Sequence, residues 1–216
     1  DLSNEALPHL AVATGKICGV PMRLFRMSFT GELGYEVNVP SDYGLAVWEA
    51  IHASGQRHGI VAYGTESMHV LRAEKGYIIV GQETDGTVTP DDAGLGWAIG
   101  KTKPDFVGKR ALARAALNAP ERKQLVGLLT TDPHTVLDEG AQLVATPGQK
   151  PPMKLIGHVT SSYHSPTLGR SIALALVCGG RARLGQTLHV PMPNGEIPVQ
   201  VVDPVFYDPK GARLHG

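Results

Sequence analysis

Glu36 is the residue whose type and position most clearly suggest a chemical role. It lies on an expected strand in which Tyr35, Val37 and Val39 share one face. Glu36 and Asn38 project from the opposite face, because successive side chains alternate along a strand. A carboxylate held on a rigid strand can accept two parallel N–H bonds from the edge of a planar amino-heterocycle. Periodicity alone, however, favours a solvated glutamate on the outer face of a half-exposed strand.

The residues just before Glu36 could complete a ligand-binding surface. Phe29 and Tyr35 could supply aromatic ring faces, although strand alternation places Tyr35 toward the core. Gly31 and Gly34 bracket a tight turn, and glycine also lets a ligand approach the backbone closely. The spacing is not GxGxxG and does not open a helix, so it does not predict a dinucleotide site.

Two residues farther along the chain are further candidates, each with a purely structural alternative. Arg72 lies on an expected helix, where it is either solvated, which the pattern favours, or placed to reach a ligand carboxylate. Trp97 is either a core residue or a stacking platform for a ligand ring.

The nine histidines do not predict a metal site. His52 and His58 are six residues apart, as are His158 and His164, and no HxxxH or HExxH pattern occurs. A serine hydrolase is not predicted either, because the chain has no GxSxG elbow.

The composition argues against several classes of partner. Lysine plus arginine and aspartate plus glutamate both number 20, so the chain has no basic field to attract nucleic acid. The longest apolar run, residues 171–178, is too short to span a membrane, and the N-terminus resembles no signal peptide. Cys18 and Cys178 could form one disulfide, but two reduced thiols in a cytoplasmic protein are the favoured interpretation. Because residue 1 is aspartate, we expect a fragment of a longer chain.

The first region of the chain alternates strand-like and helix-like patterns. Strands are predicted over 22–29 and 34–39, and helices over 41–55, 65–76 and 107–117. Leu45, Trp48 and Ile51 recur at helical spacing in the first helix, and the second is expected to bury Met68 and Leu71. This irregular mixture of strands and helices favours an α+β layer with an antiparallel sheet.

The helical period disappears in the second region. Short apolar runs follow at 124–129, 141–145, 156–160, 172–177, 187–190 and 197–202, separated by turns rich in Gly, Pro and Asp. Regularly spaced short strands of this kind predict a small barrel or a sandwich. We therefore place a domain boundary between residues 117 and 118, which gives domains 1–117 and 118–216.

Taken in order, many of these segments resemble the aminomethyltransferase family, typified by the glycine-cleavage T-protein. The matching segments are residues 1–3, 29–36, 71–76, 89–90, 95–97, 105–109, 125–128, 157–161 and 165–169, so the resemblance covers nearly the whole chain. The exact residues at 28–32, 69–77, 84–90 and 206–209 make the resemblance more specific. These segments resemble the C-terminal end of the alpha subunits of heterotetrameric sarcosine oxidases.

The resemblance implies a fold and a function. The fold would be T-protein-like: an antiparallel ferredoxin-like α/β part, truncated at its N-terminus, followed by a small C-terminal β-barrel or jelly-roll-like domain. In sarcosine oxidases, which use oxygen as acceptor, sarcosine is oxidised at a flavin and its one-carbon unit passes to tetrahydrofolate. The products are 5,10-methylenetetrahydrofolate and glycine, and the T-protein-like domain binds the folate. FAD, FMN and NAD are expected elsewhere in the complex, with the beta, gamma and delta subunits as partners.

The resemblance also assigns residues to the folate site. Glu36 matches the family's pterin-anchoring glutamate, Phe29 stands where T-proteins usually carry a tyrosine, and Trp97 matches a tryptophan that lines the site. The full implied set is Glu36, Phe29, Gly31, Tyr35, Trp97 and Arg72.

Two departures from the family pattern matter. T-proteins carry an arginine that helps to hold the folate where this chain has Met68, so Arg72, Arg122 or Lys123 would have to hold the folate tail. The family's catalytic aspartate lies upstream of Asp1, so no catalytic residue is expected in this chain and the fragment alone is expected to be inactive. Two alternatives stay open: an aminomethyltransferase or dimethylglycine-dehydrogenase-type folate domain, and a non-catalytic folate-binding or assembly module.

Overall fold

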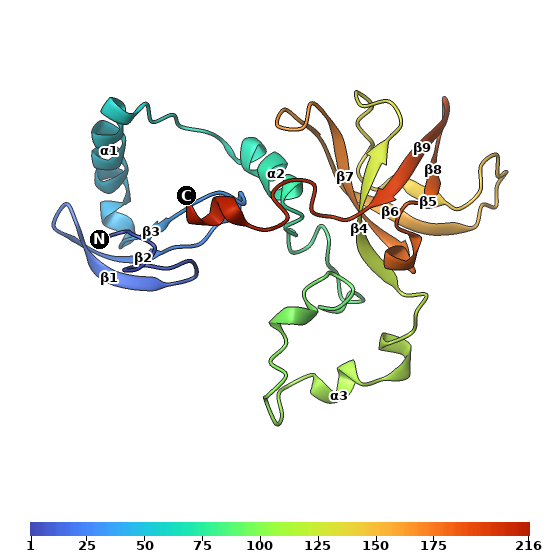
Figure 1. The fold of residues 1–216 in the computed structure, drawn as a ribbon, viewed down its shortest axis with the longest axis horizontal. Helices are drawn as coiled ribbons and strands as arrows, with labels where there is room; N and C mark the ends of the chain where they lie inside the picture. Colours follow the sequence, from blue (N-terminus) through green and yellow to red (C-terminus); the bar gives the residue numbers. More distant parts are fainter. The chain divides into compact units, whose positions relative to one another are not determined.

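A computed structural model describes residues 1–216, and the chain divides into two units (Figure 1). Unit 1 consists of Asp1–Leu71 together with Asp208–Gly216, and unit 2 consists of Arg72–Tyr207. No helix is both long enough and apolar enough to cross a membrane.

Unit 1 contains a three-stranded antiparallel sheet in the order β1-β2-β3. Its strands are β1 (Val12–Ile17), β2 (Val20–Phe25) and β3 (Glu36–Asn38). The prediction missed β1 altogether and placed β2 too late in the chain. Cys18 and Gly19 both have positive φ, 51° and 79°, which is the backbone of a two-residue hairpin turn that joins β1 to β2.

Helix α1 (Gly44–Gly55) covers one face of this sheet. A cavity of about 690 Å³ lies between them and is lined by Leu24 and Val37 from the sheet and by Val47 from the helix. The predicted helix end at Gly55 is confirmed, but the predicted helical stripe is only partly buried. Val47 is buried and Ile51 is half-buried, and both line this cavity. Leu45 and Trp48, in contrast, are 71% and 57% exposed.

Helix α2 (Thr65–Glu74) begins where the sequence predicts and ends before Gly76, whose φ is 72°. The expectation that it buries Met68 and Leu71 is wrong, since both are only half-buried. Its buried residues are Arg72, Ala73 and Glu74. The last turn of the helix therefore brings charge into the interior, and this charge requires partners there.

Unit 2 contains a closed barrel of six antiparallel strands, in the order β4-β7-β6-β5-β8-β9. The strands are β4 (Lys123–Thr130), β5 (Gln142–Val144), β6 (Leu155–Ser165), β7 (Arg170–Cys178), β8 (Thr187–Met192) and β9 (Gly195–Val202). Each of the six predicted runs overlaps one of these strands. Because the sheet closes on itself, the predicted barrel is right and the alternative sandwich is wrong. The barrel core is apolar and includes Val126, Leu128, Leu143, Val159, Ala175, Val177, Leu188, Val190, Val199 and Val201.

The segment before the barrel has little regular structure. The predicted helix over 107–117 is wrong, because only α3 (Lys109–Leu112) and a 3-10 turn (Ala115–Leu117) form. Gly108 at φ 96° starts α3, and the extended Arg114 separates it from the turn. The remaining 3-10 turns are Ser41–Tyr43, Gln56–His58, Gly96–Ala98, Gly180–Arg183 and Ala212–His215.

Residues 72–117 pack with the barrel, so the two units divide earlier than the predicted domain boundary at 117/118. For example, the backbone N–H of Leu125 on β4 donates to the carbonyl of Asp92 over 2.8 Å. The domain boundary at 117/118 stays a prediction.

Candidate functional site

Glu36 begins β3, which is an edge strand of the unit 1 sheet. The predicted alternation holds: Glu36 and Asn38 are exposed, whereas Val37 is half-buried. The Glu36 carboxylate makes no hydrogen bond or ion pair within the structure. All four of its lone-pair positions are therefore available to an external donor.

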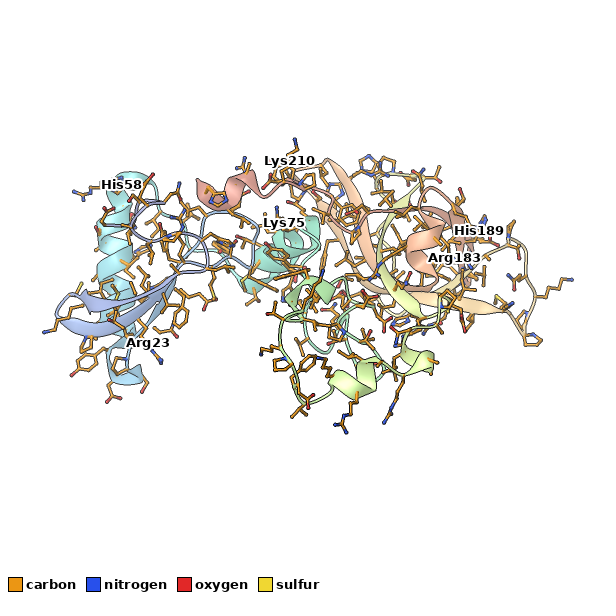
Figure 2. All side chains as sticks on the ribbon, turned by 60° about the horizontal axis from the view of Figure 1, so that its bottom comes forward. Arg23, His58, Lys75, Arg183, His189 and Lys210 are labelled. Atoms are coloured by element: carbon orange, nitrogen blue, oxygen red, sulfur yellow. The ribbon has the colours of Figure 1, made fainter.

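The face of the sheet that carries Glu36 is the one that α1 does not cover. Antiparallel pairing places Glu36 opposite Phe25 and Asn38 opposite Arg23 on the neighbouring strand. Directly opposed residues have Cβ atoms about 4.5–5.5 Å apart, so the side chains of Phe25 and Glu36 leave the sheet as neighbours on the same face. Arg23 is exposed on the same face (Figure 2). Sequence reasoning missed Phe25 and Arg23, because only the strand register brings them beside Glu36.

Tyr35 lies on the other face of the strand from Glu36. Its hydroxyl donates to the carbonyl of Leu2 over 3.2 Å, and its ring lines the cavity under α1. This orientation agrees with the predicted alternation and separates Tyr35 from the Glu36 carboxylate. Phe29 is half-buried in the loop that follows β2, so its predicted place at the end of a strand is wrong.

The two glycines of the motif have different roles. Gly31 is buried and adopts φ 81°, a conformation that favours glycine. A Cβ at Gly34 would come within 2.8 Å of the Met27 carbonyl oxygen. At Gly34, therefore, the close backbone approach that we considered for a ligand is made by the chain itself.

Arg72 is neither solvated nor placed to reach a ligand, because it is fully buried inside unit 2. Its Nη1 donates to Glu83 Oε2 over 3.1 Å and to the Tyr77 carbonyl over 3.0 Å. Its Nη2 donates to Ser161 Oγ over 2.6 Å and to the Tyr163 hydroxyl over 3.2 Å. Glu83 is also fully buried. The guanidinium is thus committed to a structural ion pair, which corrects its assignment to the folate tail.

The two other cations considered for the folate tail, Arg122 and Lys123, differ in whether they already have partners within the chain. Arg122 Nε lies 3.1 and 3.0 Å from the two carboxylate oxygens of Asp92, and its Nη2 donates to the Thr87 carbonyl over 2.6 Å. Lys123 is exposed at the start of β4 and makes no side-chain hydrogen bond or ion pair. Arg122 is therefore already paired, whereas the Lys123 ammonium is available.

Trp97 lies in the 3-10 turn Gly96–Ala98 of unit 2 and is 77% exposed. The core interpretation of this residue is therefore wrong. An exposed indole can present its face to a planar ring. Of the six residues predicted to bind folate, Trp97 and Arg72 belong to unit 2 and the other four to unit 1.

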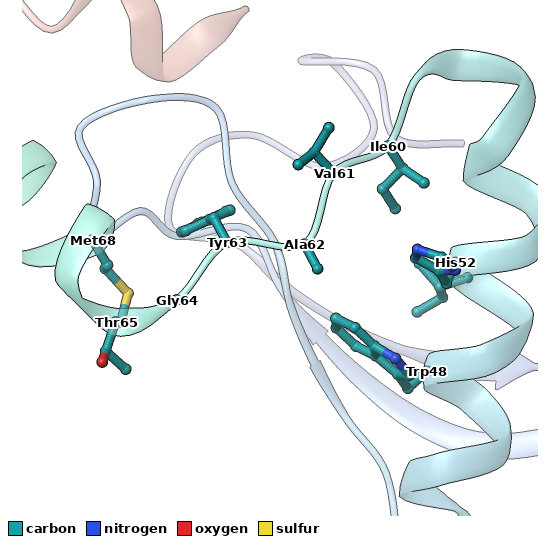
Figure 3. Close-up of a pocket in the computed structure, with 10 residues that line it drawn as sticks. Trp48, His52, Ile60, Val61, Ala62, Tyr63, Gly64, Thr65 and Met68 are labelled. Atoms are coloured by element: carbon teal, nitrogen blue, oxygen red, sulfur yellow. The ribbon is translucent and has the colours of Figure 1, made fainter. Parts of the chain in front are cut away.

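Met68 lines an apolar cavity of about 440 Å³ in unit 1. Figure 3 shows Trp48 and His52 from α1 facing the segment with Ala62 and Tyr63, while Met68 projects from the start of α2. An arginine at this position would place a charge among apolar side chains, which is costly without a partner. The surroundings of residue 68 thus suit methionine, a flexible apolar residue that fills irregular gaps.

The residues around Glu36 in unit 1 fit a pterin. A pterin presents adjacent N–H donors along one edge and a planar ring system. The unpartnered Glu36 carboxylate can accept from the edge, and Phe25, opposite Glu36 on the neighbouring strand, is an aromatic residue on the same face. In contrast, no group of three or more His, Cys, Asp or Glu side chains is placed to hold a metal ion.

Two family models match this chain. The GCVT N-terminal domain matches residues 1–103, and the glycine cleavage T-protein C-terminal barrel domain matches residues 123–208. The chain belongs to the glycine cleavage T-protein family. The six-stranded barrel of unit 2 is therefore the T-protein barrel, and the predicted fold class and family are confirmed.

Individual T-protein relatives agree with this placement. The chain is 49% identical over 222 residues to the sarcosine oxidase subunit alpha of Corynebacterium sp. (strain P-1), covering 100% of this chain and 22% of that protein. It is 32% identical over 217 residues to the mitochondrial dimethylglycine dehydrogenase of Rattus norvegicus, covering 99% and 24%. The crystal structure of the glycine cleavage system aminomethyltransferase T from Bartonella henselae superposes with a TM-score of 0.74 at 25% identity, covering 87% of this chain and 50% of that one. The chain thus spans only about a fifth of the first two relatives.

Proposed function

We propose that this chain is the tetrahydrofolate-binding part of a sarcosine oxidase alpha subunit. In this role it helps to pass the one-carbon unit of oxidised sarcosine to tetrahydrofolate, giving 5,10-methylenetetrahydrofolate and glycine. The observation that carries the proposal is the exposed, unpartnered Glu36 carboxylate on an edge strand, in a T-protein chain 49% identical to a sarcosine oxidase alpha subunit.

The residues of this chain act by binding and orienting the acceptor. Glu36 accepts the N–H groups along the pterin edge, a charge-assisted arrangement that fixes the plane and direction of the ring. Phe25, and Phe29 with it, provide apolar surface next to that edge, and Trp97 offers a stacking face. Tetrahydrofolate, when bound, supplies the amine nitrogens that accept the one-carbon unit. The folate-binding set that we propose is Glu36, Phe29, Gly31, Tyr35 and Trp97, with Phe25 added and Arg72 withdrawn.

The chemistry that this chain does not supply is assigned to the rest of a longer protein and its assembly. Oxidation of sarcosine, with oxygen as acceptor, takes place at a flavin outside this chain, and FAD, FMN and NAD are bound elsewhere. The partners are the beta, gamma and delta subunits, the complex is cytoplasmic, and the catalytic acid lies outside this chain. Taken alone, the chain is inactive.

Product partition tests this proposal. The iminium formed from sarcosine either transfers its methylene group to tetrahydrofolate or reacts with water, which gives formaldehyde and glycine. In the complete enzyme, wild type with tetrahydrofolate should produce methylenetetrahydrofolate, whereas Glu36→Gln should release more formaldehyde at an unchanged rate of sarcosine oxidation. Glu66→Gln removes an exposed glutamate charge on α2 and should partition like wild type. Equal partition in wild type and Glu36→Gln would reject the role of Glu36.

A second candidate is a folate domain of the dimethylglycine-dehydrogenase or aminomethyltransferase type. The 32% identity to the rat dimethylglycine dehydrogenase over 99% of the chain favours it, but the 49% identity to a sarcosine oxidase subunit ranks it second. Comparing sarcosine, dimethylglycine and aminomethyl-lipoyl protein as one-carbon donors separates the candidates. A chain that binds tetrahydrofolate but takes part in transfer from none of them would be a binding or assembly module.

A further inference from the structure

The last nine residues of the chain, Asp208–Gly216, fold back into unit 1 as a capped turn that we call the tail. The Asp208 carboxylate accepts hydrogen bonds from the backbone N–H groups of Ala212 and Arg213, each over 3.0 Å. These two bonds satisfy donors at the start of the 3-10 turn Ala212–His215. The tail therefore has a defined conformation from which Arg213 projects.

Arg213 binds the motif that leads to Glu36. Its Nε lies 2.6 and 2.7 Å from the two carboxylate oxygens of Glu32. Glu32 sits between Gly31, with its positive φ, and Gly34, which is packed against a backbone carbonyl. The chain end also lies close to this motif, since a Cβ built on Gly216 would come within 3.2 Å of Leu33 Cδ2.

The other contacts of the tail attach it to the buried part of unit 1. The His215 carbonyl accepts a hydrogen bond from Asn4 Nδ2 over 3.1 Å, and the His215 ring meets His9 edge to face at 6.2 Å between centroids. Asn4 in turn accepts a hydrogen bond from Arg26, which is only 2% exposed and donates to the Leu7 carbonyl over 2.8 Å. Arg213 is therefore held by an anchored segment.

The Arg213–Glu32 ion pair adds little to the stability of the fold. The side chains are 52% and 37% exposed, and exposed ion pairs add little to stability because water screens them. The main effect of the ion pair is to fix the position of Glu32. Glu32 lies four residues before Glu36, and β3 is a three-residue edge strand held by β2 alone. The start of such a strand needs an external restraint to keep a fixed direction.

We propose that Arg213 is a positioning residue which, by clamping Glu32, sets the turn 31–34 and hence the direction of the Glu36 carboxylate. This inference rests on the proposed role of Glu36 in folate binding. It extends the site to the end of the chain, to a residue that does not touch the folate.

The test combines tetrahydrofolate titration with hydrogen exchange on the full-length protein. Arg213→Ala and Glu32→Ala should each weaken binding by about three- to tenfold, the upper end of what an exposed pair with a positioning role can supply. Amides of residues 31–36 should exchange faster, while those of β1 and the barrel stay unchanged. The exchanged pair, Glu32→Arg with Arg213→Glu, should recover most of the affinity. Arg181→Ala, which breaks a comparably exposed pair with Asp91, is the matched control and should change neither measurement.

The outcomes separate this inference from the proposed function. If Glu36→Gln weakens binding but Arg213→Ala alters neither affinity nor exchange at 31–36, the clamp is rejected and the folate site stands. Faster exchange throughout unit 1, without rescue by the exchanged pair, would also reject the clamp, because Arg213 would then be a general stabiliser. Wild type that fails to bind tetrahydrofolate would overturn the proposed function and the inference built on it.

Discussion

Replacing Arg72 by methionine should destabilise the barrel of unit 2, and the cause can be followed atom by atom. Arg72 and Glu83 are both fully buried, with 3.1 Å between Nη1 and Oε2. Without the guanidinium, Glu83 keeps hydrogen bonds from the Ile79 N–H, over 2.8 Å, and from the Ser161 hydroxyl. It loses its only cationic partner and remains a charge inside the protein.

The expected cost is large because only one partner is removed. Breaking a buried ion pair in this way costs about 3–5 kcal/mol, since the remaining charge is left uncompensated. Because tenfold in an equilibrium constant corresponds to about 1.36 kcal/mol, the opening equilibrium of the barrel should rise about 10²- to 10⁴-fold. Arg72→Met with Glu83→Leu removes both charges and should recover most of this loss.

Hydrogen exchange of the full-length protein measures the effect locally. Amides of β6 and β7, which follow the opening of the barrel, should exchange faster in Arg72→Met, whereas β1 and β2 provide an internal reference. A change below about 1 kcal/mol, the range of an exposed pair, would refute the structural role of Arg72. It would also restore Arg72 as a candidate for the folate tail.

Three further predictions concern single positions. Burial raises the pKa of Asp92, but hydrogen bonds from Arg122 and Thr89 outweigh it and leave that pKa below its usual value. The ionised Asp92 carboxylate therefore adds to the free energy of unfolding at pH values above the pKa that it has in the unfolded chain. This stabilisation should be lost as pH falls below about 4. The stability of Asp92→Asn should therefore depend less steeply on pH in the acid range. A Cβ on Gly157 would lie 2.9 Å from Val177 Cα, so Gly157→Ala should lower barrel stability by about 1–3 kcal/mol in denaturant titrations, and an unchanged midpoint would contradict that packing. Trp97→Ala should change stability by less than about 0.5 kcal/mol because the indole is exposed, yet weaken tetrahydrofolate binding in a fluorescence titration; a large loss of stability would instead indicate a core residue.

The barrel was the most predictable part of the fold. Each of its six strands carries a short apolar run bounded by turn residues, and both signals are local. The hairpin of unit 1 was missed because β1 contains Thr14, Gly15 and Lys16, which weaken the apolar alternation. The face of α1 was assigned only in part, because helical spacing marks several possible stripes. The sheet selects the one that contains Val47 and Ile51, and leaves Leu45 exposed.

In the candidate site, too, features set by neighbouring residues were predicted from the sequence, whereas contacts between distant residues were not. The outward direction of Glu36 follows from strand alternation and was predicted. The burial of Arg72 could not be predicted, because its partners Glu83 and Ser161 lie 11 and 89 residues away in the sequence. The contact between Arg213 and Glu32 spans 181 residues, so no pattern within either segment reveals it.

The central claim is that Glu36 anchors the pterin ring, and a tetrahydrofolate titration of the full-length protein tests it most directly. Glu36→Gln keeps the size of the side chain and removes the charge, so it should cost about 1.5–3 kcal/mol of binding free energy, the worth of a charge-assisted hydrogen bond. The dissociation constant should therefore rise about 10- to 150-fold, while Glu66→Gln leaves it unchanged. Equal affinities in wild type and Glu36→Gln would remove Glu36 from the folate site.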